Sequence, residues 1–267
     1  MILIALARGL YFIAVMLLFG GAVFGALLKA RLAVIAPLPR RGLVLLALMA
    51  GCVWFILATA QMAGALTQSA MLEAATATRF GQVFLVRLAA LLGLFLACKH
   101  DKAAALLAAV ALALPAVTSH AAASSPAGFA AIGTALDAVH LLAAGFWIGG
   151  LAVLAALFAR KEPEILPALS LFSEWALVAV LLLVMTGLVN AASILLGGGA
   201  DAAPYLTVLG VKLALVLVML GLAAVNRFKL MPRAQSAVIA RNAGLELGLG
   251  IIVLLLAGAL GQLPPTL

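Results

Sequence analysis

Long runs of apolar residues, separated by short polar segments, make up almost the whole chain. Each run is long enough to cross about 30 Å of hydrocarbon as an α-helix. No stretch alternates apolar and polar residues as the strands of a membrane β-barrel do. The pattern therefore predicts an all-α integral membrane protein with eight transmembrane helices, at residues 3–28, 43–66, 82–98, 103–119, 131–158, 169–195, 205–225 and 243–262.

The composition agrees with this class. Of the 267 residues, 67% are hydrophobic and 9% are charged, which leaves too few polar side chains to cover a soluble domain of this length. A net charge of +8 is also found in nucleic-acid-binding proteins, but here the basic residues gather in short loops between the apolar runs. We therefore expect a lipid bilayer and no nucleic acid as the partner. Cys52 and Cys98 form no disulfide or CxxC pattern and are expected to be core residues.

Basic residues occur in every second loop. These loops hold twelve of the sixteen Lys and Arg residues, the opposite loops hold only Arg79, and the remaining three, Arg8, Arg87 and Lys212, lie within helices. Cytoplasmic loops of membrane proteins carry such an excess of Lys and Arg. We therefore expect both termini on the outer side of the membrane.

The third and seventh predicted helices resemble each other. The segment RFGQVFLVRL at Arg79–Leu88 aligns with PYLTVLGVKL at Pro204–Leu213, which places Arg87 opposite Lys212. Both cations lie about two turns below the outer interface, a depth at which a charged side chain needs a partner in the protein. We expect both to face protein and not lipid.

The first and fifth predicted helices can be aligned in the same way. Gly20 then lies on Gly149, and Tyr11 lies opposite His140. We therefore expect a single transmembrane domain built from two four-helix repeats. Because each repeat has an even number of spans, the two would be parallel. The repeats would cover residues 1–125 and 126–267.

The run Ala135–Leu154, ALDAVHLLAAGFWIGGLAVL, carries Asp137 and His140 at membrane depth. Ionisable residues are costly there, so they indicate a functional site. One helical turn separates them, which puts both on the same face. Gly145 and Gly149, four residues apart, predict that the backbone of another helix comes close. We expect this helix to carry the functional site inside the bundle.

A soft-metal site is one use for these residues. His120, at the outer end of the fourth helix, is joined to the fifth helix by a short loop and is expected near His140. Methionine together with histidine favours copper over harder cations, and the methionines available are Met16, Met62, Met71 and Met185. Packing is the alternative role for each methionine, and a hydrogen bond to Asp137 or to a neighbouring helix is the alternative for His140. His100 lies in a basic turn and is expected to be solvated.

Acidic residues are scarce within the helices. Asp137 is the candidate partner for either Arg87 or Lys212, as a structural ion pair or as part of a conduction path. Asn190 adds a neutral partner. Two further acidic residues lie near the cytoplasmic ends of their helices and are expected at the interface, Glu174 and Glu246.

Several segments resemble the copper resistance protein D (CopD) family. They are HLLAAGFWIGG at His140–Gly150, LVAVLLLVMTGLVNA at Leu177–Ala191 and VKLALVLVMLGLAAVNRFKLMPR at Val211–Arg233, and TRFGQVFLVRL in the third helix fits the same family. The resemblance implies an eight-helix protein of the bacterial inner membrane with periplasmic termini. It also implies a role in copper homeostasis, in which copper moves from periplasm to cytoplasm, often beside a periplasmic copper-binding partner of the CopC type.

The resemblance also carries over to single residues. His140, Arg87, Lys212 and Asn190 match family positions, and His120 resembles the histidine at the lip of the family's fourth helix. The outer loops of this chain are short and poor in Met and His, and no CopC-like domain is fused to it. A high capacity for capturing periplasmic copper is therefore not expected.

We expect a copper transporter or permease and not an enzyme. The outward-facing entry site for the copper ion would use His140 and His120, with Asp137 orienting the His140 ring or attracting the cation. Met16 and Met62 are its candidate thioether ligands. The chain has no P-loop and no DKTG motif, so transport is expected to be passive or coupled to a gradient.

Two other functions are compatible with the sequence. One is a membrane redox protein that holds haem b between two axial histidines; of the three histidines only His120 and His140 are candidates, which allows at most one such haem. The chain can also be a scaffold that docks periplasmic copper carriers without transporting the metal.

Overall fold

The computed structural model describes residues 1–64, 66–118, 130–196 and 203–263, and these residues form helices and no strand. Eight helical segments among them are long and apolar enough to span a membrane, which confirms the predicted class. The spans are built on α1 (Ile2–Leu32), α2 (Arg40–Ala63), α4 (Arg79–Leu96), α5 (Asp101–Ala113), α7 (Ala130–Ala159), α8 (Ile165–Leu196), α9 (Ala203–Val225) and α10 (Ser236–Leu260). The 3₁₀ turn η1 (Leu114–Thr118) extends α5, and α9 continues through the π-helix η2 (Asn226–Leu230) into the 3₁₀ turn η3 (Met231–Arg233).

Two local features differ from the prediction. The segment between the second and third spans was expected to be a loop, but it forms the helix α3 (Gln68–Ala77), which Thr67 caps by accepting a hydrogen bond from the Ala70 amide at 3.2 Å. The last span begins at Ser236 and not at 243. It extends this far because Arg241 lies on an exposed face of the helix, where a basic side chain near the membrane surface reaches water.

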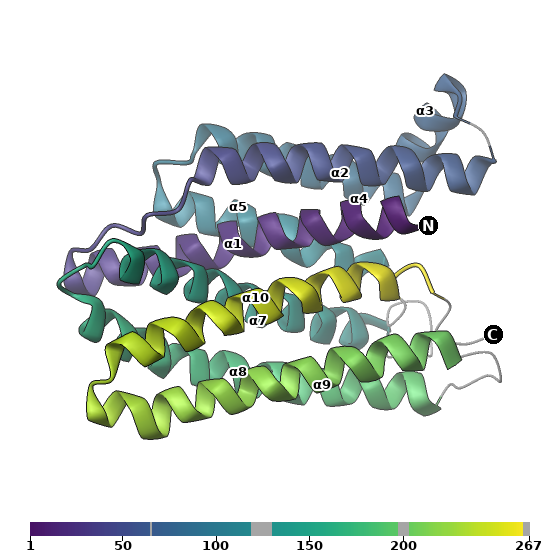
Figure 1. The fold of residues 1–267 in the computed structure, drawn as a ribbon. Coiled ribbons are helices and arrows are strands. Elements are labelled where there is room, and N and C mark those ends of the chain that lie inside the picture. The colour runs from purple at the N-terminus through teal and green to yellow at the C-terminus, as the bar shows by residue number, and fades with distance from the viewer. Residues whose placement is uncertain (65, 119–129, 197–202, 264–267) are drawn as a thin grey trace.

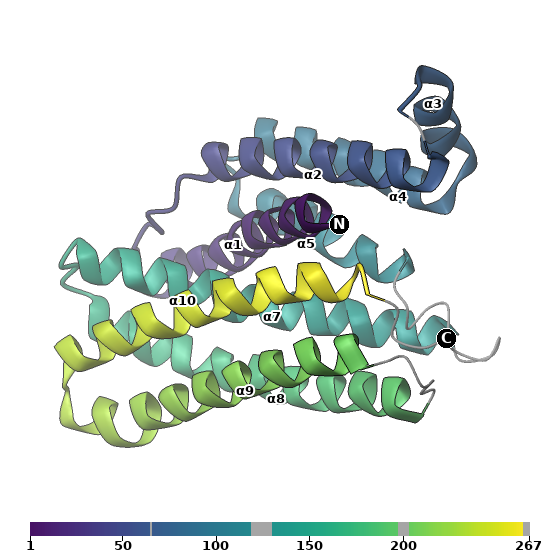
Figure 2. The ribbon, with the colours of Figure 1, turned by 45° about the vertical axis from the view of Figure 1, so that its right-hand side comes forward.

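The helices run lengthwise through the bundle, and α1 begins at the same end at which α10 ends (Figure 1). We call this the terminal end. The opposite end carries the connections at residues 33–39, 97–100, 160–164 and 226–235 and is called the basic end. There Arg40 donates a 2.5 Å hydrogen bond to Asp101, and Lys29 lies 3.9 Å from the same carboxylate. Figure 2 shows α3 beyond the terminal end of α2.

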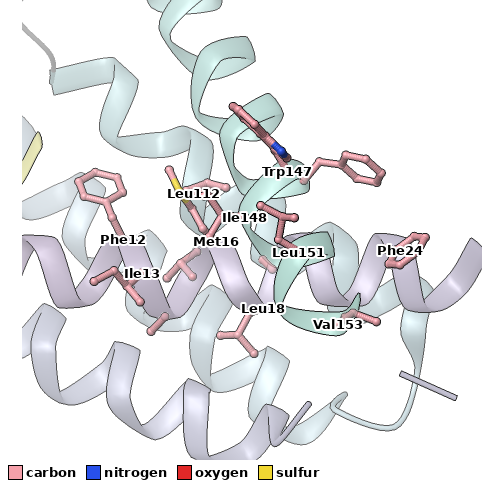
Figure 3. Close-up of a cluster of buried hydrophobic side chains, with 14 of the residues drawn as sticks. Phe12, Ile13, Met16, Leu18, Phe24, Leu112, Trp147, Ile148, Leu151 and Val153 are labelled. Carbon is pink, nitrogen blue, oxygen red and sulfur yellow. The ribbon is translucent and has the colours of Figure 1, made fainter. Parts of the chain in front are cut away.

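The two central helices are α1 and α7. Helix α1 packs on α2, α5, α7 and α10, and α7 packs on α1, α5, α8 and α10. Their facing sides form the apolar core shown in Figure 3, where Met16 and Phe12 of α1 lie near Leu112 of α5 and Ile148 of α7. Because lipid tails are as apolar as these side chains, close packing rather than escape from water holds such helices together.

Glycines allow α1 and α7 to touch backbone to backbone. A Cβ atom on Gly20 would overlap the Gly145 carbonyl and the Gly149 Cα, and a Cβ atom on Gly149 would overlap the Gly20 Cα and the Met16 carbonyl. The expectation that Gly145 and Gly149 admit another helix is therefore confirmed. The partner is the glycine that the sequence alignment places opposite Gly149.

The duplication itself stays a prediction, and its boundary lies outside the described residues. The helix neighbours are compatible with it. Helix α1 packs on α2 and α5 as α7 packs on α8 and α10, and α4 packs on α5 as α9 packs on α10. One pair differs, because α2 packs on α4 but no comparable packing of α8 on α9 is found in the described chain.

We predict that Gly20→Val destabilises the bundle, because the new side chain must push the α1 and α7 backbones apart. Overpacking of this kind costs about 1–3 kcal/mol or more. Thermal unfolding of the purified protein in detergent measures the loss. The control is Gly221→Val on α9, where no atom lies within 4 Å of the added Cβ. Equal melting temperatures for the two variants would contradict the proposed contact.

Candidate functional site

Polar side chains of α7, α8 and α9 meet in the terminal half of the bundle. Asp137 and His140 come from α7, Thr186 and Asn190 from α8, and Lys212 from α9. We call these five residues the histidine cluster. On both α7 and α8 the two polar residues are about one helical turn apart, so each pair shares a face. The apolar residues around them make these two faces pack against each other.

The His140 ring is held by α8. Its Nδ1 atom lies 2.9 Å from the Thr186 hydroxyl, and that hydroxyl donates its only hydrogen to the Leu182 carbonyl at 2.6 Å. With that hydrogen on the Leu182 carbonyl, the hydroxyl accepts from Nδ1–H, and this assignment leaves the lone pair on Nε2. His140 also has a hydrogen bond with the backbone of Leu183. The ring also packs against Gly187 at 3.5 Å, where a larger residue would press on it.

This arrangement corrects one expectation. Asp137 was expected either to orient the His140 ring or to attract the cation, and the first of these roles belongs to Thr186 of the neighbouring helix. Asp137 instead accepts a 2.6 Å hydrogen bond from the Asn190 side chain. Thr186 is 3% exposed. The sequence signal for its role is its position one helical turn before Asn190, which puts both polar side chains on the same face of α8.

Lys212 is the cation of the histidine cluster. It is half-buried and interacts electrostatically with both Asp137 and His140. The described residues contain two ion pairs within 4.0 Å, and both involve Asp101 at the basic end. Lys212 and Asp137 therefore attract each other without a direct hydrogen-bonded pair. This leaves the Asp137 carboxylate able to attract a second cation.

Arg87 has a different environment from Lys212. It is 3% exposed, as expected for a cation that faces protein. Its guanidinium stacks over the rings of Tyr11 at 4.0 Å and Trp54 at 4.6 Å. Its Nε donates to the Tyr11 hydroxyl at 2.9 Å, and that hydroxyl donates to the Ala111 carbonyl at 2.8 Å. The partner of Arg87 is thus aromatic, and Arg87 joins α4 to α1, α2 and α5.

The other candidate ligands are not gathered around His140. His120 lies outside the described residues. Met16 is buried among apolar side chains, and Met62 is exposed near the end of α2. His100 is exposed, as expected. Among the described residues no group of three or more His, Cys, Asp and Glu side chains is placed to hold a metal ion, so a metal at His140 would need ligands from outside that set.

A second polar group, which the sequence analysis missed, lies towards the basic end. Glu246 was expected at the interface, but it is 2% exposed. Its Oε1 accepts a 2.7 Å hydrogen bond from Asn226, whose own carbonyl accepts one from Asn242 at 2.8 Å. We call these three residues the glutamate cluster. The expectation was wrong because the early start of α10 places Glu246 about 15 Å along the helix axis from its first residue.

The glutamate cluster borders a cavity of about 160 Å³ between α7, α8, α9 and α10. Glu246 and Asn226 line one side, and Trp147 of α7 lines another. Trp147 is about two turns from His140 on the same face of α7. Arg227 also lines the cavity, and its guanidinium donates to the Ser173 carbonyl and hydroxyl at 2.5 and 2.6 Å.

Comparisons with known proteins point to one family. A family model described as Copper resistance protein D matches residues 166–260, and one described as Copper resistance protein D-like, N-terminal domain, matches residues 1–131. Copper resistance protein D of Pseudomonas syringae pv. tomato is 32% identical to this chain in an alignment of 296 positions. The alignment covers 94% of this chain and 93% of that protein. Copper transport protein CutJ of Bacillus subtilis (strain 168) is 32% identical over 139 residues, 50% of this chain and 26% of that protein. No solved structure matches the chain.

The role of Thr186 can be tested by nitrogen NMR. We predict that in the wild type the His140 ring carries its hydrogen on Nδ1, and that Thr186→Val raises the population of the other tautomer because the hydroxyl acceptor is lost. Ring-¹⁵N-labelled protein gives the measurement, with the His140 signals assigned by their absence in His140→Ala. Thr207→Val is the control, since among the described residues the Thr207 hydroxyl bonds to the Ala203 carbonyl of its own helix and to nothing on another helix. An unchanged His140 spectrum in Thr186→Val would contradict the assignment.

Proposed function

The chain belongs to the copper resistance protein D family, and from that premise we propose that it is a copper transporter of the bacterial inner membrane. Its eight apolar helices support a multi-pass membrane protein. The names of its relatives, copper resistance protein D and copper transport protein CutJ, support copper as the cargo. Transport runs from periplasm to cytoplasm in this proposal, with the terminal end of the bundle in the periplasm.

His140 carries the proposal. Its Nδ1 is bonded to Thr186, so the free lone pair on Nε2 is available to a soft metal ion. The adjacent Asp137 supplies the negative charge that attracts a cation into an apolar environment, where a lone charge is costly. His120, on the connection that leads into α7, is the proposed second nitrogen ligand. This puts copper entry in the terminal half of the bundle.

Lys212 keeps such a site from holding its cargo too tightly. It interacts with both Asp137 and His140, so its charge repels an arriving copper ion and competes with it for Asp137. A transport site must bind strongly enough for entry and weakly enough for release. The cation of the cluster therefore makes the site transient, whereas storage of copper would need a site without it.

The supply of copper follows from the orientation. We propose a periplasmic copper-binding protein of the CopC type as the donor. The donor would dock at the terminal end, where α3 and the start of α1 lie. The bundle then receives copper on the same side as its entry site.

We predict that His140→Ala abolishes copper uptake at matched expression, because the ligand that replaces water around the ion is lost. Uptake of copper by proteoliposomes, read by a fluorescent copper probe inside the vesicles, gives the measurement. His100→Ala is the matched control, since His100 is exposed at the basic end. Full uptake by His140→Ala would leave His140 with a packing role only.

The orientation has its own test. We predict that a periplasmic reporter such as alkaline phosphatase is active when fused to the C-terminus, and that a cytoplasmic reporter at the same place is inactive. The reason is that the basic loops favour the cytoplasmic side. A fusion in the loop at 160–164 is the control and should show the reverse pattern. An active cytoplasmic reporter at the C-terminus would invert the orientation and overturn entry from the periplasm.

A further inference from the structure

The glutamate cluster holds a carboxyl group at membrane depth with no cation beside it. Glu246 is 2% exposed, and Asn226 and Asn242 are 9% and 5% exposed. Neither ion pair of the described residues includes Glu246. A carboxylate taken out of water without a countercharge is strongly disfavoured. The group must therefore carry a proton or bind a metal cation.

The neighbouring atoms favour the proton. Asn226 presents an N–H donor to Glu246 Oε1, and the carbonyl oxygen of Asn226 is already bonded to Asn242. A metal ion needs several oxygen, nitrogen or sulfur acceptors around it. Here the side chain that meets Oε1 is a donor, and among the described residues no group of three or more His, Cys, Asp and Glu side chains is placed to hold a metal ion. A carboxylic acid fits, with Oε1 as its accepting carbonyl and the proton on Oε2.

Other charged groups near α10 lie elsewhere. Arg227 of η2 is bonded to Ser173. Helices α1, α7 and α9 pack against α10 and carry six titratable residues in the terminal half of the bundle, away from Glu246: Arg8, Tyr11, Asp137, His140, Tyr205 and Lys212. At the basic end the basic residues of α1, η2 and α10 are exposed, namely Lys29, Arg31, Lys229 and Arg241. The charge of the Glu246 carboxylate is therefore neutralised by a bound proton and not by a neighbouring cation.

The cavity gives this proton a path. It is roomy enough for several water molecules, and it reaches from Trp147 to the basic end, where Arg227 and Met231 line it. The backbone of Asn226–Leu230 is a π-helix, a distortion often found at functional sites. Asn226 is the first residue of this π-helix and donates to Glu246 at the edge of the cavity.

We infer that Glu246 is a proton-binding site of the cavity, and that it takes up and releases a proton as copper passes. The second half of this inference rests on the proposed copper transport, and the first half does not. His140 and the cavity are joined along one face of α7 by Trp147. When a copper cation passes Trp147, the acid can lose its proton to cavity water, and the carboxylate left behind balances the charge of the metal. When the metal leaves, the carboxylate takes up a proton from the opposite side of the membrane, so that each copper ion that passes moves a proton across the bilayer.

Infrared spectroscopy tests the proton site without copper. We expect the full-length protein in lipid vesicles to show a C=O stretch of a protonated carboxyl group at neutral pH, absent from Glu246→Gln. Asn226→Leu should shift this band to higher frequency, because the carbonyl loses its N–H donor; a purely structural role would not move it. Glu174→Gln, which removes an exposed carboxyl of α8, should leave the band unchanged. A wild-type spectrum without the band would overturn the inference.

Proton movement tests the link to copper. A pH dye inside proteoliposomes should record a pH change that accompanies copper uptake in the wild type and in Glu174→Gln. In Glu246→Gln the change should fall to that of empty vesicles. A copper-linked pH change in Glu246→Gln equal to that of the wild type would overturn the link. A wild type that moves no copper but shows the infrared band would overturn the proposed function and support the proton site.

Discussion

The contact of Gly20 with Gly149 sets the geometry of the bundle. Two helix axes come this close only where neither residue has a side chain, so the crossing point of α1 and α7 is fixed to a single place. All other spans pack directly or indirectly on these two helices. Tyr11 and His140 each precede the contact glycine of their own helix by nine residues. The crossing therefore brings both to similar depth in the terminal half.

The bundle accommodates a cation at that depth in two different ways. Around Tyr11 the cation Arg87 is stacked between aromatic rings and hydrogen-bonded, which fills the space with a rigid arrangement. Around His140 the cation Lys212 is half-buried and forms no direct ion pair with another residue of the described chain. A buried charge held by stacking and hydrogen bonds favours one structure, whereas a loosely paired charge can move when another cation arrives. This contrast favours a structural role for the first four spans and places the proposed copper site in the last four.

The sequence predicted the spans well because their signal is local. Apolar runs and basic loops identify eight helices and their common ends, and a pair of glycines four apart identifies a close contact. It predicted that Arg87 faces protein for the same reason, since an isolated charge in lipid is too costly. The partners were harder to predict, because they depend on the rotation of one helix against another. Thr186 and Tyr11 are ordinary residues of their own helices. Thr186 becomes the partner of His140 only when α8 packs on α7, and Tyr11 becomes the partner of Arg87 only when the α1 and α4 side chains meet.

Glu246 shows the physical limit of the sequence reasoning. Its helix was expected to start at 243, so the carboxyl group was assigned to the interface. The start of a helix at a membrane surface is poorly marked, because Arg241 can belong either to a loop or to a first turn whose side chains reach water. Moving the start to Ser236 carries Glu246 about two turns deeper, to a level where a carboxylate without a countercharge is strongly disfavoured. The cavity between α7, α8, α9 and α10 lies beside it, and a residue that was assigned to the interface becomes a group whose charge state depends on what occupies the bundle.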